Sequence, residues 1–167
     1  MKIIDEILKP LSTAPLQAYV DNRIQLYDVI EKILKETGPA EIYISTFSTS
    51  EEFLRRIYKF RSAKLITKAI MLTDLKASKK TMNLYRFVSM VFDQVYLGEN
   101  HSKVILIHND RWSVSVCTSQ NQTRGNRVES GMISTDNAIF QSLFVSLSQI
   151  IQTKTIQLDG LFKRTVD

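Results

Sequence analysis

The chain has 167 residues, of which 44% are hydrophobic and 23% charged, and its 22 basic residues outnumber its 17 acidic ones to give a formal net charge of +5. That apolar content excludes a disordered chain, and the length suits one ordinary domain with a sizeable core. Every apolar run is interrupted within a few residues by serine, glutamine or a charged residue, so no membrane span is expected. A single cysteine, Cys117, excludes an internal disulfide and a cysteine-based zinc cage.

The N-terminal sequence places Asp5 and Glu6 where a signal peptide needs an apolar run, so we expect a cytoplasmic protein and not a secreted one. Residues 1–23 contain two of the three prolines and are predicted to form an N-terminal arm, with a short helix and an extended segment. Residues 24–167 are predicted to form one domain. The positive charge permits an anionic partner but does not require one.

The first long helix is predicted just after Ile24. Apolar residues recur there with a helical period from Leu26 to Leu34. Asp21 and Asn22 precede this stripe as candidate caps, and the dipeptide at 38–39, Gly-Pro, stops it.

A β-rich run at 41–47 predicts a strand, after which Ser48 and Glu51 have the spacing of a capping box that opens a helix. Two more helices are predicted to begin at the caps Ser78 and Asp136. Further strands are predicted at 64–73, 93–97, 103–107, 112–117 and 128–133. Strands that alternate with helices and then cluster predict an α/β fold, in which a mixed β-sheet is flanked by helices.

The middle of the chain carries side chains suited to phosphate chemistry. His101 and Lys103 lie two residues apart at the head of an apolar strand, so both project from one face. An imidazole can attack phosphorus or relay a proton, and an ammonium group neutralises non-bridging oxygens. Ser119 and Asn121 have the same spacing past the next strand and can donate hydrogen bonds to those oxygens. Glu129 supplies a carboxylate that can hold a histidine ring nitrogen and fix its tautomer.

Taken singly, each of these residues has an ordinary interpretation. A lone histidine at a strand start is usually structural or merely exposed, and a lysine beside it is usually a solvated charge. Serine and asparagine after a strand most often form turns. The functional signal therefore lies in their order and spacing together.

In that order and spacing the chain resembles the phospholipase D superfamily, whose motif is His-x-Lys-x4-Asp followed by a Gly-Ser-x-Asn turn and a later glutamate. Residues 101–103 match the first part, residues 119–121 the second, and Glu129 the third. The resemblance spans roughly residues 24–152 and implies the fold of that family. It also implies a phosphodiesterase that needs neither metal nor cofactor, in which His101 attacks phosphorus and water then hydrolyses the phosphohistidine.

The chain has one His-x-Lys motif, whereas the family's chemistry uses two histidines, one to attack and one to protonate the leaving oxygen. The resemblance to the short members of the family therefore implies a twofold homodimer with one shared active site. Each subunit would contribute the same catalytic residues, His101, Lys103, Ser119, Asn121 and Glu129. The neighbouring candidates for substrate binding are Thr118, Arg124 and Arg127.

The chain departs from the family pattern at two positions. His108 stands where the motif has aspartate, and Thr118 stands where the turn has glycine. Odd-numbered residues of the strand share the pocket face, so His108 is predicted to point away from the pocket in a structural role. Asp110 can replace the missing acid only if a β-bulge shifts the register. The Cβ of Thr118 is expected to crowd a bound phosphate.

Size and charge favour nucleic acid as the substrate, with phospholipid as the alternative. The chain has no long amphipathic or apolar surface segment that would favour lipid docking. The basic residues form three runs: Arg55, Arg56, Lys59, Arg61 and Lys64; Lys76, Lys79 and Lys80; and Arg124 with Arg127. The ordinary interpretation of the first of these runs is a solvated helix face.

Three other interpretations stay open. The first is a catalytically degenerate DNA-binding or assembly module, which the changes at His108 and Thr118 favour. The second is a lipid-acting phospholipase or transferase, and the third is an α/β domain whose motif match is accidental. Cys117 is expected to be a small buried hydrophobe. The aromatic residues assigned to the core or to a dimer interface are Tyr43, Phe47, Tyr85, Phe87, Trp112, Phe140 and Phe144.

Overall fold

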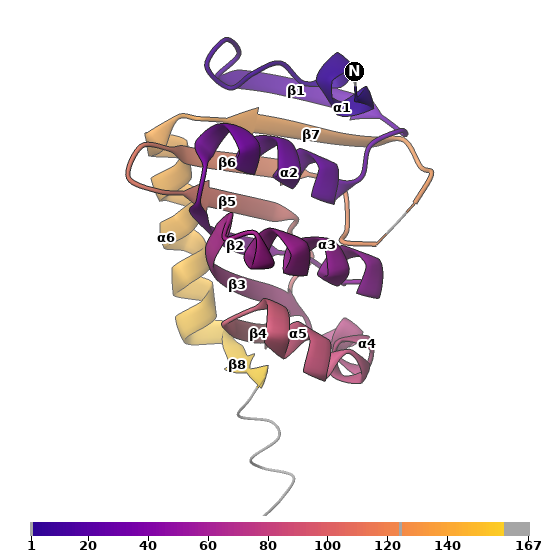
Figure 1. The fold of residues 1–167 in the computed structure, drawn as a ribbon. Helices are drawn as coiled ribbons and strands as arrows, with labels where there is room; N and C mark the ends of the chain where they lie inside the picture. Colours follow the sequence, from indigo (N-terminus) through magenta and orange to yellow (C-terminus); the bar gives the residue numbers. More distant parts are fainter. Residues whose placement is uncertain (1, 124, 159–167) are drawn as a thin grey trace, which may run out of the picture.

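The computed structural model describes residues 2–123 and 125–158, which form an eight-stranded sheet in the order β1-β7-β6-β5-β2-β3-β4-β8. Strand β3 is parallel to β2 and β4, and the other pairs are antiparallel. The predicted α/β class with a mixed sheet is therefore confirmed (Figure 1). The elements are α1 (Ile3–Ile7), β1 (Leu16–Asp21), α2 (Leu26–Thr37), β2 (Ala40–Ser45), α3 (Glu51–Ser62), β3 (Ile66–Asp74), the 3-10 turn η1 (Leu75–Ala77), α4 (Ser78–Asn83), α5 (Tyr85–Val91), β4 (Gln94–Gly98), β5 (Val104–His108), β6 (Ser113–Thr118), β7 (Glu129–Ser134), α6 (Asn137–Lys154) and β8 (Thr155–Gln157).

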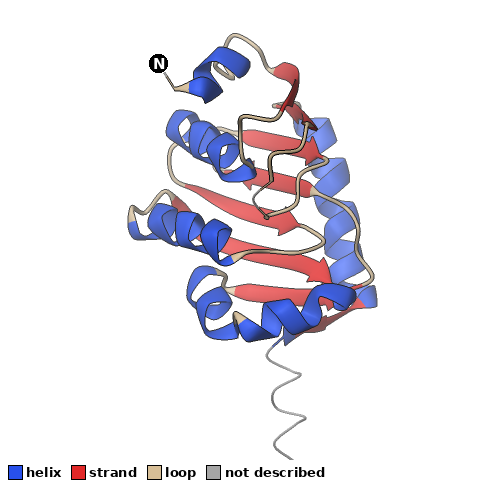
Figure 2. Ribbon diagram, turned by 90° about the vertical axis from the view of Figure 1, so that its right-hand side faces the viewer, coloured by secondary structure: helices blue, strands red, loops and turns tan. Residues whose placement is uncertain are grey.

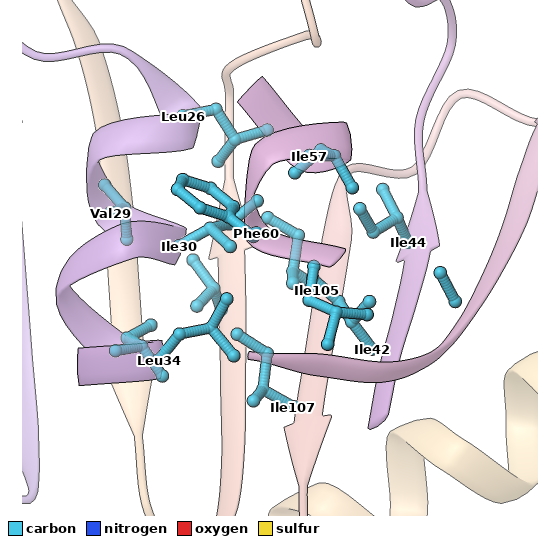
Figure 3. Packing of buried hydrophobic residues seen from close by; sticks show 14 of the residues in the cluster. Leu26, Val29, Ile30, Leu34, Ile42, Ile44, Ile57, Phe60, Ile105 and Ile107 are labelled. Carbon is cyan, nitrogen blue, oxygen red and sulfur yellow. The ribbon is translucent and has the colours of Figure 1, made fainter. Parts of the chain in front are cut away.

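Helices cover both faces of the sheet, with α2 to α5 on one side and α6 on the other (Figures 1 and 2). The main core lies between α2, α3 and the central strands (Figure 3). Ile42 and Ile44 of β2 pair with Ile107 and Ile105 of β5 and point into this core, while Tyr43 points toward α6. No helix in the described ranges is long and apolar enough to cross a membrane.

The cap predicted for α2 is wrong. Gln25 is the N-cap, and its main-chain N–H donates to the Asp28 carboxylate at 2.8 Å in a capping box. Asp21 cannot cap the helix because it ends strand β1, where its carboxylate accepts hydrogen bonds from Arg23. The helix ends at Gly38, as predicted.

The predicted capping box of α3 is also wrong. Ser50 is the N-cap and accepts a hydrogen bond from the main-chain N–H of Phe53, while Ser48 lies in the preceding loop. For α6 the prediction is confirmed, since the Asp136 carboxylate accepts from the main-chain N–H of Ile139 at 2.9 Å. The helix predicted to begin at Ser78 is divided into α4 and α5.

The N-terminal residues form one edge of the sheet. Strand β1 pairs antiparallel with β7 along its whole length. Ile4, Leu8 and Leu11, which precede this strand, are buried in the core. Tyr19 of β1 is also buried and lies over Gly131, so its phenol ring reaches across β7 toward the end of β6.

Cys117, predicted to be buried, is instead exposed. Its side chain lies on the α6 side of the sheet, where strands β1 and β7 carry no covering helix (Figure 1). Val20 and Met132 on the same surface are 72% and 54% exposed. The strand alternates serine and valine, and Cys117 shares the face of Ser113 and Ser115, whereas Val114 and Val116 point into the core. The prediction failed because it treated the whole strand as buried.

Substituting Gly131 tests this packing. A Cβ at this position would lie 2.5 Å from the Tyr19 ring, which is held in place by burial and by its hydroxyl contacts. We expect Gly131→Ala to lower the free energy of unfolding by about 1–3 kcal/mol, measured by urea denaturation. Gly125→Ala is the matched control, because Gly125 is exposed and a Cβ there meets nothing closer than 4.0 Å. Equal stability of the two variants would contradict this account of the edge.

Candidate active site

The candidate residues lie at strand ends that meet on one side of the sheet, where β2 and β6 end and β5 and β7 begin. Val104 begins β5 and pairs with Ser45 at the end of β2 and with Cys117 near the end of β6. Gly131 near the start of β7 pairs with Thr118 at the end of β6. Because neighbouring antiparallel strands run in opposite directions, the first residues of β5 and β7 lie beside the last residues of β2 and β6. The connecting loops lie toward the viewer in Figure 2.

His101 and Lys103 lie together just before β5. The Lys103 ammonium donates to the main-chain oxygen of His101 at 3.0 Å, and its Nζ lies 3.5 Å from the ring Nδ1. The His101 ring packs against Phe47, with 5.4 Å between the ring centroids. His101 is exposed and Lys103 is half-buried. The arrangement therefore leaves an imidazole open to solvent with a cation beside it.

The second and third parts of the motif are joined to the first by hydrogen bonds. The main-chain N–H of Thr118 donates to the carbonyl oxygen of Lys103 at 3.1 Å. The next residue, Ser119, donates its hydroxyl to the Glu129 carboxylate. Among the described residues, the hydrogen-bond partner of Glu129 is thus this serine and not a histidine. These contacts hold the hydroxyl, the carboxylate and the ammonium group at one strand end.

Thr118, at the position of the motif's glycine, builds the turn with its side chain. Its hydroxyl donates to the main-chain oxygen of Ser130 at 2.8 Å and accepts from the main-chain N–H of Gln120 at 3.1 Å. The Tyr19 hydroxyl donates to the Gln120 side chain at 2.6 Å. Burial raises the pKa of the Tyr19 phenol, which keeps it protonated as a donor. The threonine hydroxyl therefore points toward β7 and is hydrogen-bonded to main-chain groups of the turn.

Asn121 lies farther along the same loop. This loop is tied to the one after β2 by a bridge between Thr49 and Gln122 and by a 2.7 Å hydrogen bond from the Ser50 hydroxyl to the Gln122 main-chain oxygen. The Asn121 side chain is half-buried, and its Oδ1 has no hydrogen-bond partner in the described structure. No hydrogen bond between described residues joins it to the histidine–lysine pair. Its loop is thus tied to the loop after β2, and its amide is not bonded to the pair.

A buried polar network holds the segment that carries His101. The Asn100 amide donates to the main-chain oxygen of Thr46 at 2.9 Å and accepts from the main-chain N–H of Ser102 at 3.2 Å. The main-chain N–H of Asn100 donates to the Asp74 carboxylate at 2.7 Å. Asn100 and Asp74 are only 8% and 7% exposed, so this network is shielded from water. The residues on both sides of His101 are therefore fixed to β2 and β3.

The motif does not indicate four further residues that lie at this site: Tyr19, Phe47, Asp74 and Asn100. The signal that was present is weak: polar residues end the two apolar runs that become β2 and β3, and an asparagine precedes the motif histidine. The contacts of Tyr19 come from a distant part of the chain, and nothing in the local sequence indicates them.

No hydrogen bond in the described structure joins the remaining candidates to this cluster. Arg127 is exposed on the loop before β7, and Arg124 lies outside the described residues. His108 points to the α6 side at the opposite end of β5, as predicted, and its ring stacks on Tyr43 at 5.9 Å. Asp110 is exposed in the hairpin beyond His108, far from the strand ends that carry the motif. Within the described ranges, no three His, Cys, Asp or Glu side chains form a group that could hold a metal ion.

The sequence matches no protein-family model and no curated protein. The structure is similar to NucT from Helicobacter pylori, with a TM-score of 0.63 and 14% identity over 83% of this chain and 96% of that chain. It is also similar to Nuc from Salmonella typhimurium, a phospholipase D family member, with a TM-score of 0.63 and 14% identity over 85% of this chain and 96% of that chain. A third similar structure is TrmBL2, an archaeal chromatin protein, with a TM-score of 0.61 and 8% identity over 91% of this chain and 57% of that one. The chain thus shares its fold with a phospholipase D family member, as the resemblance implied.

The buried network makes a prediction about stability. Asn100→Ala removes the partner of Thr46 and Ser102 main-chain groups and leaves buried polar atoms unpaired, so we expect it to lower the free energy of unfolding by about 1–3 kcal/mol. Glu99→Ala, at the exposed neighbouring residue, should change that free energy by less than about 0.5 kcal/mol. Urea denaturation followed by circular dichroism compares the two. If both variants unfold at the same denaturant concentration, the network does not hold this segment.

Proposed function

We propose that this protein is a phosphodiesterase that needs no metal and cleaves nucleic acid through a phosphohistidine intermediate, at a site shared by two copies of the chain. The observation that carries the proposal is the exposed His101 imidazole with the Lys103 ammonium beside it. The bonded pair of Ser119 and Glu129 lies at the same strand end. The fold shared with a phospholipase D family member supports the same chemistry.

The reaction has two displacements at phosphorus. In the first, a His101 ring nitrogen bonds to phosphorus while the bond to the leaving oxygen breaks, and a second imidazole gives that oxygen a proton. In the second, that imidazole takes a proton from water, whose oxygen bonds to phosphorus as the phosphorus–nitrogen bond breaks. Lys103 neutralises the non-bridging oxygens in both steps, and the Asn121 amide donates a hydrogen bond to them. The Ser119 hydroxyl has one proton, so it donates to a phosphate oxygen only when it turns away from Glu129. Glu129 orients the serine hydroxyl.

The second imidazole must come from another chain. The sequence contains two histidines, and His108 packs near α6 at the far end of β5. One chain therefore offers a single imidazole at the site, and a twofold axis beside the strand ends would bring a second copy of His101 to the same phosphate.

An exposed apolar surface beside the site favours such a dimer. Leu16 and Val20 of β1 are 63% and 72% exposed, and Met132 of β7 is 54% exposed. Val20 and Met132 line a hollow of about 300 Å³ on this surface, and the lining extends to Thr118 and Ser119. Contiguous exposed apolar surface of this kind marks an interaction site. A second copy seated there would lie next to the proposed catalytic residues.

Nucleic acid is the proposed substrate because of the net charge of +5 and the exposed Arg127 beside the motif. The similar fold of a chromatin protein described by its mode of DNA binding supports the same class of ligand. A second candidate function is nucleic-acid binding without hydrolysis. The observation in its favour is the Thr118 side chain, which occupies the turn where the motif has glycine.

The catalytic proposal is tested by substituting His101. We expect His101→Asn to reduce hydrolysis of bis(p-nitrophenyl) phosphate and of DNA by about 1,000-fold or more, because both the nucleophile and the acid are lost from the shared site. His108→Asn is the matched control and should retain activity, since His108 lies on the α6 side. EDTA should not inhibit the wild-type protein. Unchanged turnover by His101→Asn would remove this residue from the mechanism, and an absolute requirement for Mg²⁺ would indicate another class of enzyme.

The shared site is tested by weakening the proposed interface. Met132→Glu places a charge on the exposed apolar surface, so we expect it to raise the dimer dissociation constant about tenfold or more in analytical ultracentrifugation and to reduce activity in parallel. Ile3→Glu is the control, because Ile3 is 46% exposed but lies on the N-terminal helix beside α2. A wild-type protein that sediments as an active monomer would contradict the proposal.

A further inference from the structure

A groove of about 580 Å³ lies on the outer surface of α3 and α5, two helices that lie side by side over the same face of the sheet (Figure 1). This volume is in the range of pockets that hold a ligand of nucleotide size. Three cations and one carboxylate line the groove together with three apolar or aromatic side chains. The lining residues are Glu52, Arg55, Arg56, Tyr58, Lys59, Phe87 and Met90.

The cations point outward because α3 is amphipathic. Its buried side packs into the core, so Arg55, Arg56 and Lys59 are left on the exposed side. The Arg55 guanidinium lies 5.9 Å from the Phe87 ring centroid, and that of Arg56 lies 4.9 Å from the Tyr27 ring centroid. The first cation–π contact holds Arg55 beside a ring of the groove, whereas the second is with a ring of α2 that does not line it.

Two aromatic rings form the wall between these cations. Tyr58 is 41% exposed, and its ring lies 6.3 Å from that of the half-buried Phe87 in an edge-to-face arrangement. Met90, at the end of the groove, is 61% exposed. Phe87, which was expected to belong to the core or to a dimer interface, packs against the core and is also partly open to solvent in this groove.

A solvated helix face does not account for this composition. Of the first basic run, Arg61 does serve the fold: it forms a two-pronged ion pair with Asp93 and lowers the pKa of that carboxyl group. Arg55 pairs with Glu51, but both side chains are more than half exposed, so the pair contributes little and yields readily to a phosphate. An ordinary solvated face has no need for an exposed tyrosine and methionine between its cations.

We propose that the α3–α5 groove binds a segment of single-stranded nucleic acid. Phosphates of the strand would contact Arg56 and Lys59, and an unpaired base would stack on the Tyr58–Phe87 wall. Grooves that combine cations with exposed aromatic rings recognise single strands in this way, because every unpaired base offers a flat face. A duplex keeps its bases stacked inside and could use only the cations.

The groove shares a lining residue, Glu52, with the small pocket that contains Asn121. The N-cap of α3, Ser50, is hydrogen-bonded to Gln122 in the loop that follows Asn121. A strand in the groove can therefore continue toward the strand ends that carry His101. The assignment of nucleic acid as the ligand rests on the proposed function, whereas the binding itself does not require hydrolysis.

The experiment measures the fluorescence anisotropy of a labelled oligothymidylate of about 20 nucleotides, with His101→Asn present in every protein so that no cleavage occurs. Tyr58→Ala should weaken binding about tenfold through lost stacking. Arg56→Glu/Lys59→Glu should weaken it at least as much and should reduce the slope of log affinity against log salt by about 1.4, since each single-strand phosphate contributes about 0.7. Lys9→Glu/Lys154→Glu is the control, because it changes the net charge equally at exposed sites outside the groove.

Three results separate the alternatives. Equal binding by the groove variants and the charge-matched control would overturn the proposal. The proposal would also be overturned if Tyr58→Ala lowered the affinity for a duplex of the same length as much as it lowers the affinity for the single strand. The groove would then not distinguish unpaired bases. Loss of single-strand binding in the groove variants would support the groove even if the wild-type protein failed to hydrolyse bis(p-nitrophenyl) phosphate, in which case the catalytic proposal alone would fail.

Discussion

The position of β5 between β2 and β6 is the constraint on which the whole site depends. Val104 is opposite Ser45 on one side and Cys117 on the other, and the Thr118 main chain donates to Lys103 directly beyond that row. A shift of one residue in this register would turn Lys103, like every side chain of the strand, to the opposite face of the sheet. The apolar residues of β5, which are buried between α2 and α3, fix the register because a slip would expose them.

The two faces of the sheet have different tasks. The face beneath α2 and α3 supplies the rigid core, and its strand ends carry the proposed catalytic groups. The α6 face is less completely covered, so β1 and β7 keep exposed apolar side chains beside the same strand ends. A chain that contributes a single imidazole and leaves apolar surface next to it is incomplete for two-histidine chemistry. The lack of a second imidazole in one chain is therefore the reason why the proposed chemistry requires the proposed dimer.

The sequence predicted the fold well where a local pattern carries the information. Apolar periodicity predicted the helices and the central strands. The motif spacing predicted that Lys103, Ser119 and Glu129 lie at neighbouring strand ends, where the structure has them. It failed where long-range contacts decide the outcome. Gln25 caps α2 because β1 extends through Asp21, and Cys117 is exposed because no helix covers the sheet surface that it shares with Met132. The Asn100 network likewise depends on a contact with Asp74 at the end of β3, and although the strand was predicted, no local pattern indicates this contact.

A crystal structure with bound tungstate, a phosphate analogue, tests the central claim most directly. The account predicts one anion at the strand ends, contacted by His101 and Lys103 of two copies of the chain across a twofold axis. An anion held by a single chain, or His101 rings on surfaces remote from one another, would contradict it.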